Sequence, residues 1–142
     1  MKIEPKPDNP CFGCGGANSS GMHLTFEADD ERKRIIGRFS LGAEYQGGSG
    51  FLHGGIIALL LDEVMSKLTR FTGEHAVTAD LRVQYKRPIP VNSEIIVEGF
   101  VARREGRQLY HEGEIRNAAG ELLARGEGRF VAIDREKYAA RK

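Results

Sequence analysis

The sequence has no excess of either charge and no long hydrophobic run. Its 21 lysines and arginines nearly balance its 20 aspartates and glutamates, for a formal net charge of +1. No overall basic field therefore favours nucleic acid or an anionic membrane surface as a partner. The apolar run at residues 56–61 is far too short to span a membrane. Because residues 1–10 are polar and contain prolines, unlike a signal peptide, we expect a soluble, cytoplasmic protein.

Cysteine is scarce, since only Cys11 and Cys14 occur, within a glycine-rich segment. The Cys-x-x-Cys spacing suits a zinc knuckle or a redox pair. A structural zinc site needs four ligands, and His23, the nearest further candidate, makes only three. We therefore expect two reduced cysteines in a turn and no metal site.

The length of 142 residues is typical of a single domain, and the sequence contains no internal repeat. Strand patterns are expected at residues 22–28, 34–41, 77–85, 93–103, 108–116 and 121–133. One helix is expected from about Gly54 to Phe71, ended by Gly73. Short turns at residues 105–106 and 117–120 favour antiparallel pairing of the last three strands. The sequence predicts an α+β fold, a curved antiparallel sheet wrapped around one long central helix.

Apolar and polar residues alternate in the strand expected at residues 77–85. Val77 and Tyr85 belong to the apolar set, and Thr78 belongs to the polar set. Because side chains alternate across a strand, we expect Thr78 and Tyr85 on opposite faces.

The most informative segment is the start of the expected helix. His53-Gly54-Gly55 is followed by six apolar residues and then by Asp62. The N–H groups at a helix N-terminus attract a carbonyl oxygen or a developing oxyanion. Asp62 is a charge that apolar burial does not explain.

The spacing of Gly55 and Asp62 indicates how these two groups can cooperate. Seven residues bring them to the same helix face, about 10 Å apart along the axis. One carbonyl cannot lie about 3 Å from both an amide and an attacking group at that separation. Two antiparallel copies of the helix across a dimer axis can combine the amide of one subunit with Asp62 of the other.

Several ordered motifs carry a family resemblance. They are His53-Gly54-Gly55, Asp62 nine residues after the histidine, Val77-Thr78-Ala79, and Tyr85-Lys86-Arg87-Pro88-Ile89-Pro90. Together they resemble the hotdog-fold acyl-CoA thioesterases, most closely the PaaI-like (phenylacetate-pathway type) branch. Several members of that branch also begin with a Cys-x-x-Cys-Gly segment, and the resemblance covers roughly residues 11 to 133.

The resemblance implies hydrolysis of a thioester to a carboxylic acid and free coenzyme A, without metal or bound cofactor. Asp62 matches the catalytic carboxylate, which acts as nucleophile or as the general base that activates water. Gly54 or Gly55 supplies the N–H that polarises the thioester carbonyl. Thr78 matches a hydroxyl that helps to hold water or the carboxylate.

Other residues have weaker claims to a role in the site. His53 either donates a ring hydrogen bond to substrate or fixes the loop. Gln46 either orients the attacking water from across the interface or belongs to an ordinary glycine-rich loop. Lys86 and Arg87 are candidate contacts for the phosphates of coenzyme A. Arg103, Arg104 and Arg107 are further phosphate candidates, although a solvated hairpin tip explains them equally well. Glu63 is expected to be structural or to make a secondary contact.

The expected organisation is an N-terminal extension at residues 1–20, a thioesterase domain at 21–134 and a C-terminal tail at 135–142. The resemblance implies a homodimer, and pairing of two dimers is compatible with it. A non-catalytic acyl-CoA-binding protein is an alternative, although the retained Asp62 argues against it. An acyl-CoA dehydratase or hydratase is another, but it needs a different histidine motif.

Overall fold

The computed structural model describes residues 1–140, and side chains are described through residue 137. Within this range the chain forms one antiparallel sheet of seven strands with the order β1-β2-β3-β5-β6-β7-β4. The strands are β1 (Lys2–Ile3), β2 (Phe26–Asp29), β3 (Arg34–Ser40), β4 (His75–Tyr85), β5 (Glu94–Glu105), β6 (Gln108–Asn117) and β7 (Leu122–Ile133). The helices are α1 (Gly54–Ser66) and α2 (Arg135–Ala140), with short 3-10 turns η1 (Ala43–Tyr45) and η2 (Lys67–Phe71).

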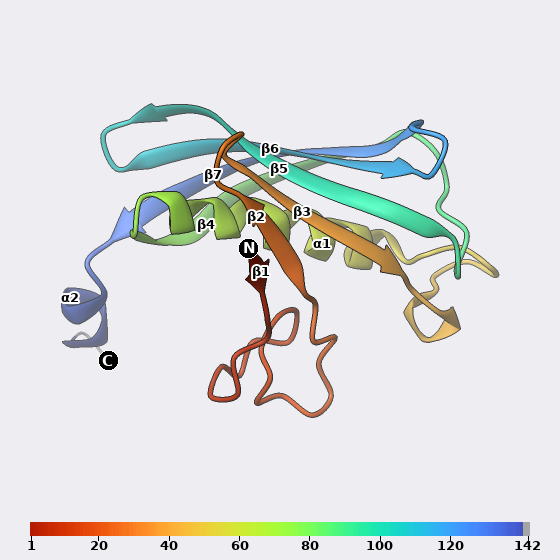
Figure 1. Ribbon diagram of the computed structural model, residues 1–142, viewed down its shortest axis with the longest axis horizontal. Coiled ribbons are helices and arrows are strands. Elements are labelled where there is room, and N and C mark those ends of the chain that lie inside the picture. The colour runs from red at the N-terminus through yellow and green to blue at the C-terminus, as the bar shows by residue number, and fades with distance from the viewer. Residues whose placement is uncertain (141–142) are drawn as a thin grey trace.

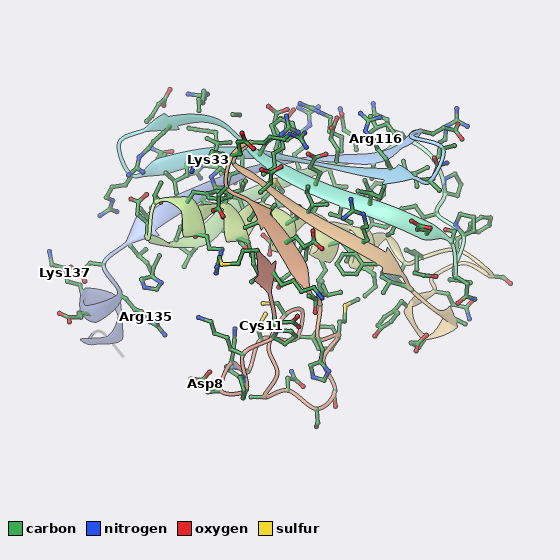
Figure 2. The ribbon with its side chains drawn as sticks, viewed as in Figure 1. Asp8, Cys11, Lys33, Arg116, Arg135 and Lys137 are labelled. Atoms are coloured by element: carbon green, nitrogen blue, oxygen red, sulfur yellow. The ribbon has the colours of Figure 1, made fainter. Side chains whose placement is uncertain are left out.

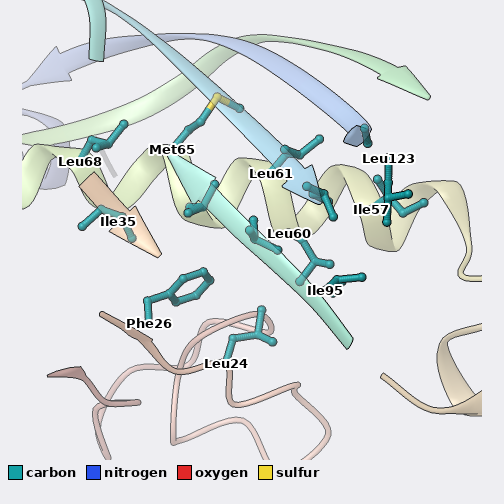
Figure 3. Close-up of a cluster of buried hydrophobic side chains, with 14 of the residues drawn as sticks. Leu24, Phe26, Ile35, Ile57, Leu60, Leu61, Met65, Leu68, Ile95 and Leu123 are labelled. Carbon is teal, nitrogen blue, oxygen red and sulfur yellow. The ribbon is translucent and has the colours of Figure 1, made fainter. Parts of the chain in front are cut away.

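The helix α1 lies along one face of the sheet, and the N-terminal loops lie on the far side of α1 from β5, β6 and β7 (Figure 1). Its buried residues are Ile57, Leu60, Leu61, Val64 and Met65. Leu24 and Phe26, from β2 and the loop before it, approach α1 from the side opposite β6 and β7, so the helix is covered on two sides by apolar side chains (Figure 3). The expected fold, a curved antiparallel sheet around one main helix, is confirmed.

A row of glycines lets α1 approach the sheet closely. Gly99, Gly113 and Gly126 are neighbours in register on β5, β6 and β7. A Cβ atom added at Gly99 would lie 2.8 Å from the backbone oxygen of Val64. Because that oxygen belongs to the helix backbone, it cannot move aside as a flexible side chain would. Side chains at these positions would therefore push the helix away from the sheet.

Several expected boundaries need correction. The α-helix ends at Ser66, and residues 67–71 continue as the 3-10 turn η2 before Gly73, which has the left-handed φ of 71°. The strand expected at residues 22–28 begins only at Phe26, because the backbone of Met22 and of Leu24 bonds instead to the loop at Phe12 and Gly13. The short strand β1 and the helix α2 have no counterpart among the expected elements.

The prediction that Thr78 and Tyr85 face opposite ways is wrong. The pairing of β4 with β7 shifts register between Thr78 and Asp80, which marks a β-bulge. A bulge adds one residue and so inverts the alternation beyond it. Both Thr78 and Tyr85 consequently contact α1.

β4 is an edge strand of the sheet. Along most of its length its residues are exposed, including the apolar side chains of Val77, Leu81 and Tyr85. Of the helices within residues 1–140, none combines the length and apolar character that crossing a membrane requires.

Candidate active site

The N-terminus of α1 is capped by the side chain of His53. The Nδ1 atom of His53 accepts a 2.8 Å hydrogen bond from the N–H of Gly55. Because Nδ1 is the acceptor, a neutral ring carries its proton on Nε2. The backbone carbonyl of His53 accepts from Ile56 and Ile57, so this residue starts the helix with both its side chain and its main chain.

Gly54 differs from Gly55 in the partner of its N–H. As the first residue of α1 it has no intrahelical acceptor, and among residues 1–140 no other acceptor bonds to this N–H. Its carbonyl oxygen accepts a 2.8 Å hydrogen bond from the hydroxyl of Tyr85, which ties β4 to the helix start. The amide available to a ligand is therefore that of Gly54, a choice that the sequence left open.

Asp62 and Thr78 meet where α1 passes β4. The hydroxyl of Thr78 donates a 2.8 Å hydrogen bond to Oδ1 of Asp62. Burial raises the pKa of the half-buried Asp62 carboxyl above its ordinary value, and the hydrogen bond from Thr78 partly opposes that rise. The neighbouring carboxylate of Glu63 raises the pKa further. The pair thus holds a carboxylate in surroundings that make it more basic than an exposed one.

A cavity of about 350 Å³ lies at the N-terminal end of α1. Gly54, Tyr85, Lys86 and Arg87 line it, together with the apolar residues Phe51, Leu52, Ile57, Pro88 and Ile89. Arg87 also forms a 3.2 Å ion pair with Glu121. The structure therefore brings the helix amide and two cations together around one largely apolar cavity.

Asp62 lies too far along the helix to reach the same ligand atom as Gly54. Eight residues of α-helix separate the two, which corresponds to about 12 Å along the axis. Within one chain, the carboxylate and the amide therefore cannot act on the same ligand atom.

The other candidates lie in different surroundings. The side-chain oxygen of Gln46 accepts a 3.1 Å hydrogen bond from the N–H of Gly50, which closes the loop before α1. Arg103 pairs with Glu105 and stacks on Tyr110. Arg104 pairs with Glu74, at 2.8 Å between Nη2 and Oε2.

The backbone carbonyl of Arg107 accepts a hydrogen bond from the N–H of Ala132. The hairpin that carries these three arginines pairs with the C-terminal end of β7, whereas Tyr85 pairs with Ala124 near its start. The hairpin arginines therefore lie at the opposite end of the sheet from Lys86 and Arg87.

Sequence reasoning gave Tyr85 no role of its own, although it is the residue that links Gly54 to β4. Its aromatic and β-forming character was sufficient to explain it as a strand residue. Glu63 lies next to Asp62 in the chain but binds Lys67, at 2.9 Å between Oε2 and Nζ.

Residues 49–124 match the thioesterase superfamily. The chain is 32% identical over 127 residues to acyl-coenzyme A thioesterase THEM4 from Bos taurus, covering 89% of this chain and 52% of that protein. It spans about half the length of the curated relatives of this kind from cattle, rat and mouse.

Solved structures share the fold. The crystal structure of a thioesterase superfamily protein matches with a TM-score of 0.76 and 32% identity, over 82% of this chain and 57% of that one. A hypothetical thioesterase from Streptococcus pneumoniae, solved with coenzyme A, matches with a TM-score of 0.67 and 14% identity, over 70% of this chain and 80% of that one. These similarities confirm the hotdog fold.

Proposed function

Since the chain belongs to the thioesterase superfamily, we propose that it hydrolyses acyl-coenzyme A thioesters to a carboxylic acid and free coenzyme A. The observation that carries this proposal is the half-buried carboxylate of Asp62, which follows a run of apolar helix residues and is held by the hydroxyl of Thr78. Partial burial of a carboxylate costs stability, so a carboxylate in this place indicates a functional role.

In the proposed reaction, Asp62 acts in its ionised form. Thr78 holds Oδ1, so Oδ2 faces either a water molecule or the thioester carbon. As a base, Asp62 takes a proton from water while the water oxygen attacks the carbon. As a nucleophile, it attacks the carbon itself and forms a mixed anhydride, which water then hydrolyses to the carboxylic acid and the free Asp62 carboxylate. In both cases the carbon–sulfur bond breaks, and the departing thiolate takes a proton to give coenzyme A.

The proposed electrophilic partner is the N–H of Gly54. Gly54 lies at the start of α1 and lines the cavity that Tyr85, Lys86 and Arg87 also line. A main-chain donor at a helix N-terminus stabilises the negative oxygen that develops when a thioester carbonyl is attacked. The His53 ring holds the neighbouring Gly55 amide and so fixes the turn that presents Gly54.

Because Gly54 and Asp62 are about 12 Å apart on one helix, we assign the complete site to a dimer. The exposed edge of β4 is suited to antiparallel pairing with a second copy of itself. If the two-fold axis crosses this pairing between Leu81 and Arg82, Thr78 of one subunit lies opposite Tyr85 of the other. Thr78 is hydrogen-bonded to Asp62, and Tyr85 is hydrogen-bonded to Gly54, within each subunit. The pairing thus joins the two halves of the site twice per dimer.

The uncovered face of α1 supports the same arrangement. Gly55, Ala58, Leu59 and Asp62 recur at helical spacing and are exposed or half-buried. The small residues Gly55 and Ala58 permit two antiparallel helices to approach closely. Such an approach covers the apolar part of this face and brings each Asp62 toward the other subunit's helix start.

Lys86 and Arg87 are proposed to bind the phosphates of coenzyme A. The Streptococcus pneumoniae protein with the same fold was solved with coenzyme A. Alanine mutants of one aspartate and one threonine of that protein were also solved, and those two residues have the same sequence separation as Asp62 and Thr78. The bound coenzyme A supports an acyl-CoA ligand for this chain, and the two mutants support a role for Asp62 and Thr78.

A thiol-release assay over aryl, short-chain and long-chain acyl-CoAs tests the proposal, with Asp62→Asn as the matched variant. We expect release from at least one class by the wild-type protein and a loss of about 10² to 10⁴-fold in the variant. Tight binding of acyl-CoA without thiol release would indicate a binding protein instead. A change in enoyl absorbance without thiol release would indicate a hydratase.

A further inference from the structure

The two cysteines lie beside a third potential ligand that the sequence did not indicate. Cys11 lies in the N-terminal loops, on the side of α1 away from β5, β6 and β7 (Figure 2). Its Sγ is 3.3 Å from Oε1 of Glu63, which comes from α1, 52 residues later. One ligand atom from each of Cys11, Cys14 and Glu63 lies within 4.8 Å of the other two. His23, the third ligand considered from the sequence, instead bonds to the carbonyl of Asn18.

The loop is shaped to hold the cysteines against Glu63. Gly13, between them, is buried, and a Cβ atom added there would lie 2.4 Å from Oε1 of Glu63. The carbonyls of Phe12 and Gly13 accept hydrogen bonds of 2.7 and 2.9 Å from Met22 and Leu24. The close approach is therefore fixed by backbone contacts and by the absence of a side chain at Gly13.

Lys67 orients the carboxylate of Glu63. Its Nζ is 2.9 Å from Oε2, so the other oxygen, Oε1, is left facing the cysteines. The side chains of Lys67 and Glu63 are only 13% and 12% exposed, and the ammonium lies 4.9 Å from the centre of the Phe26 ring. A buried ion pair that presents one oxygen to two sulfurs resembles the outer partners that orient metal ligands.

The charges of the cluster suit a divalent cation. With two thiols, one carboxylate and one ammonium, the formal charge is zero. Exchange of the two thiol protons for one divalent cation keeps the charge at zero.

We propose that Cys11, Cys14 and Glu63 bind a thiophilic divalent metal ion of the zinc class, through two sulfurs and Oε1. Tetrahedral zinc with bonds of about 2.3 Å places its sulfur ligands about 3.8 Å apart. The three ligand atoms lie within 4.8 Å of one another, so the two sulfurs need to approach by about 1 Å at most to reach that spacing. A cavity of about 420 Å³, lined in part by Cys14 and Lys67, gives access and room for water as the fourth ligand.

This site is separate from the proposed reaction, because Glu63 and Asp62 point to different partners. Its predicted effect is to clamp the N-terminal loops to α1. Metal binding to the folded state then raises the melting temperature of the protein.

Titration of the reduced full-length protein with cobalt(II) tests the proposal. We expect a thiolate-to-cobalt charge-transfer band and tetrahedral visible bands, both removed by added zinc. Cys11→Ser and Cys14→Ser should weaken or abolish the charge-transfer band, and Glu63→Gln should weaken cobalt affinity about tenfold or more. Asp62→Asn, one residue away but directed at Thr78, should retain the band.

Melting of each metal-free variant shows whether it folds, and at a given zinc concentration wild type and Asp62→Asn should gain more stability than the cysteine and Glu63→Gln variants. Protons compete for the sulfurs, so the band should weaken as the pH falls. A folded protein with two titratable thiols but no charge-transfer band would overturn the proposal. Retention of the full band after both cysteines are replaced by serine would overturn it equally.

Discussion

The hydroxyl of Thr78 donates a 2.8 Å hydrogen bond to Oδ1 of Asp62, and this single contact joins the edge strand to the middle of the central helix. It favours the ionised carboxylate, whereas burial favours the protonated one. The two largest effects on the pKa of Asp62 therefore oppose each other, and a single substitution can remove the one from Thr78.

Thr78→Val removes the hydroxyl and keeps the β-branched shape. Without the hydrogen bond, the pKa of Asp62 should rise further, because burial and Glu63 both raise it and only the weaker effect of Lys67 still lowers it. The acidic limb of the pH profile of kcat/KM should then move to higher pH. A hydrogen bond to a charged group contributes about 1.5–3 kcal/mol, so activity at neutral pH should fall about 10- to 100-fold.

Thr78→Ser is the matched control, since it keeps the hydroxyl and should keep the wild-type profile. An unchanged acidic limb in Thr78→Val would show that this hydroxyl does not set the protonation of the group that controls activity.

Asp62→Asn should separate stability from activity. Because the folded state raises the pKa of Asp62, it holds a proton that the unfolded chain has already released. This carboxyl therefore lowers stability as the pH rises through that window, and the deficit persists at neutral pH. Asparagine does not ionise and can still accept from Thr78, so the variant should melt no lower than wild type at pH 7.

The difference in melting temperature should disappear below the unfolded aspartate pKa of about 3.9. Melting curves at neutral and acidic pH check this. A variant clearly less stable than wild type at pH 7 would show that the carboxylate stabilises the fold.

His53→Ala should destabilise the protein by removing the N-cap of α1. Loss of a capping side chain costs about 0.5–2 kcal/mol, which corresponds to a few degrees in melting temperature for a domain of this size. His53→Asn, which can also accept from Gly55, should recover most of the loss. Thermal melts measure both. Equal melting of His53→Ala and wild type would mean that the hydrogen bond from Gly55 contributes nothing to the helix start.

The helix start and its carboxylate were visible in the sequence, because a glycine pair and a charge after an apolar run are local patterns. The joining of Thr78 to Asp62 was expected only from the family resemblance, since threonine in a strand is otherwise unremarkable. The common face of Thr78 and Tyr85 could not be predicted, because one bulged residue inverts the alternation and leaves no mark in composition.

Contacts between distant segments were equally hidden. Glu63 meets Cys11 only because the N-terminal loop folds back against α1. The row formed by Gly99, Gly113 and Gly126 depends on the register of three strands. Both features are properties of the assembled fold, which local periodicity does not encode.

Lys86→Ala and Arg87→Ala should weaken the binding of coenzyme A thioesters specifically. Both residues line the cavity at Gly54 and are exposed. Loss of one phosphate contact should raise KM several-fold with little change in kcat, since about 1 kcal/mol is expected for a partly solvated ionic contact. Arg87 already pairs with Glu121, so Lys86→Ala should have the larger effect.

Thioesters of N-acetylcysteamine lack the nucleotide phosphates and supply the control. Their KM should be unchanged in both variants. An equal rise in KM for the short and the complete thioesters would place Lys86 and Arg87 away from the phosphates.

Mixing two inactive proteins tests whether the site is shared between subunits. Asp62→Ala keeps the amide of Gly54, and Gly54→Leu keeps the carboxylate while its side chain blocks the cavity beside Tyr85. After subunit exchange at equal amounts, half of the dimers are mixed, and each mixed dimer has one intact site. About a quarter of wild-type activity should therefore return.

The matched control mixes wild type with the double variant Asp62→Ala/Gly54→Leu. Its mixed dimers have no intact site if the site is shared, but one if the site lies within a single chain. A shared site therefore predicts about a quarter of wild-type activity in both mixtures. A site within one chain predicts none in the first mixture and about half in the second. Thiol release distinguishes these outcomes. The light-scattering mass of the same samples shows whether both mixtures are dimeric, which the comparison of their activities requires.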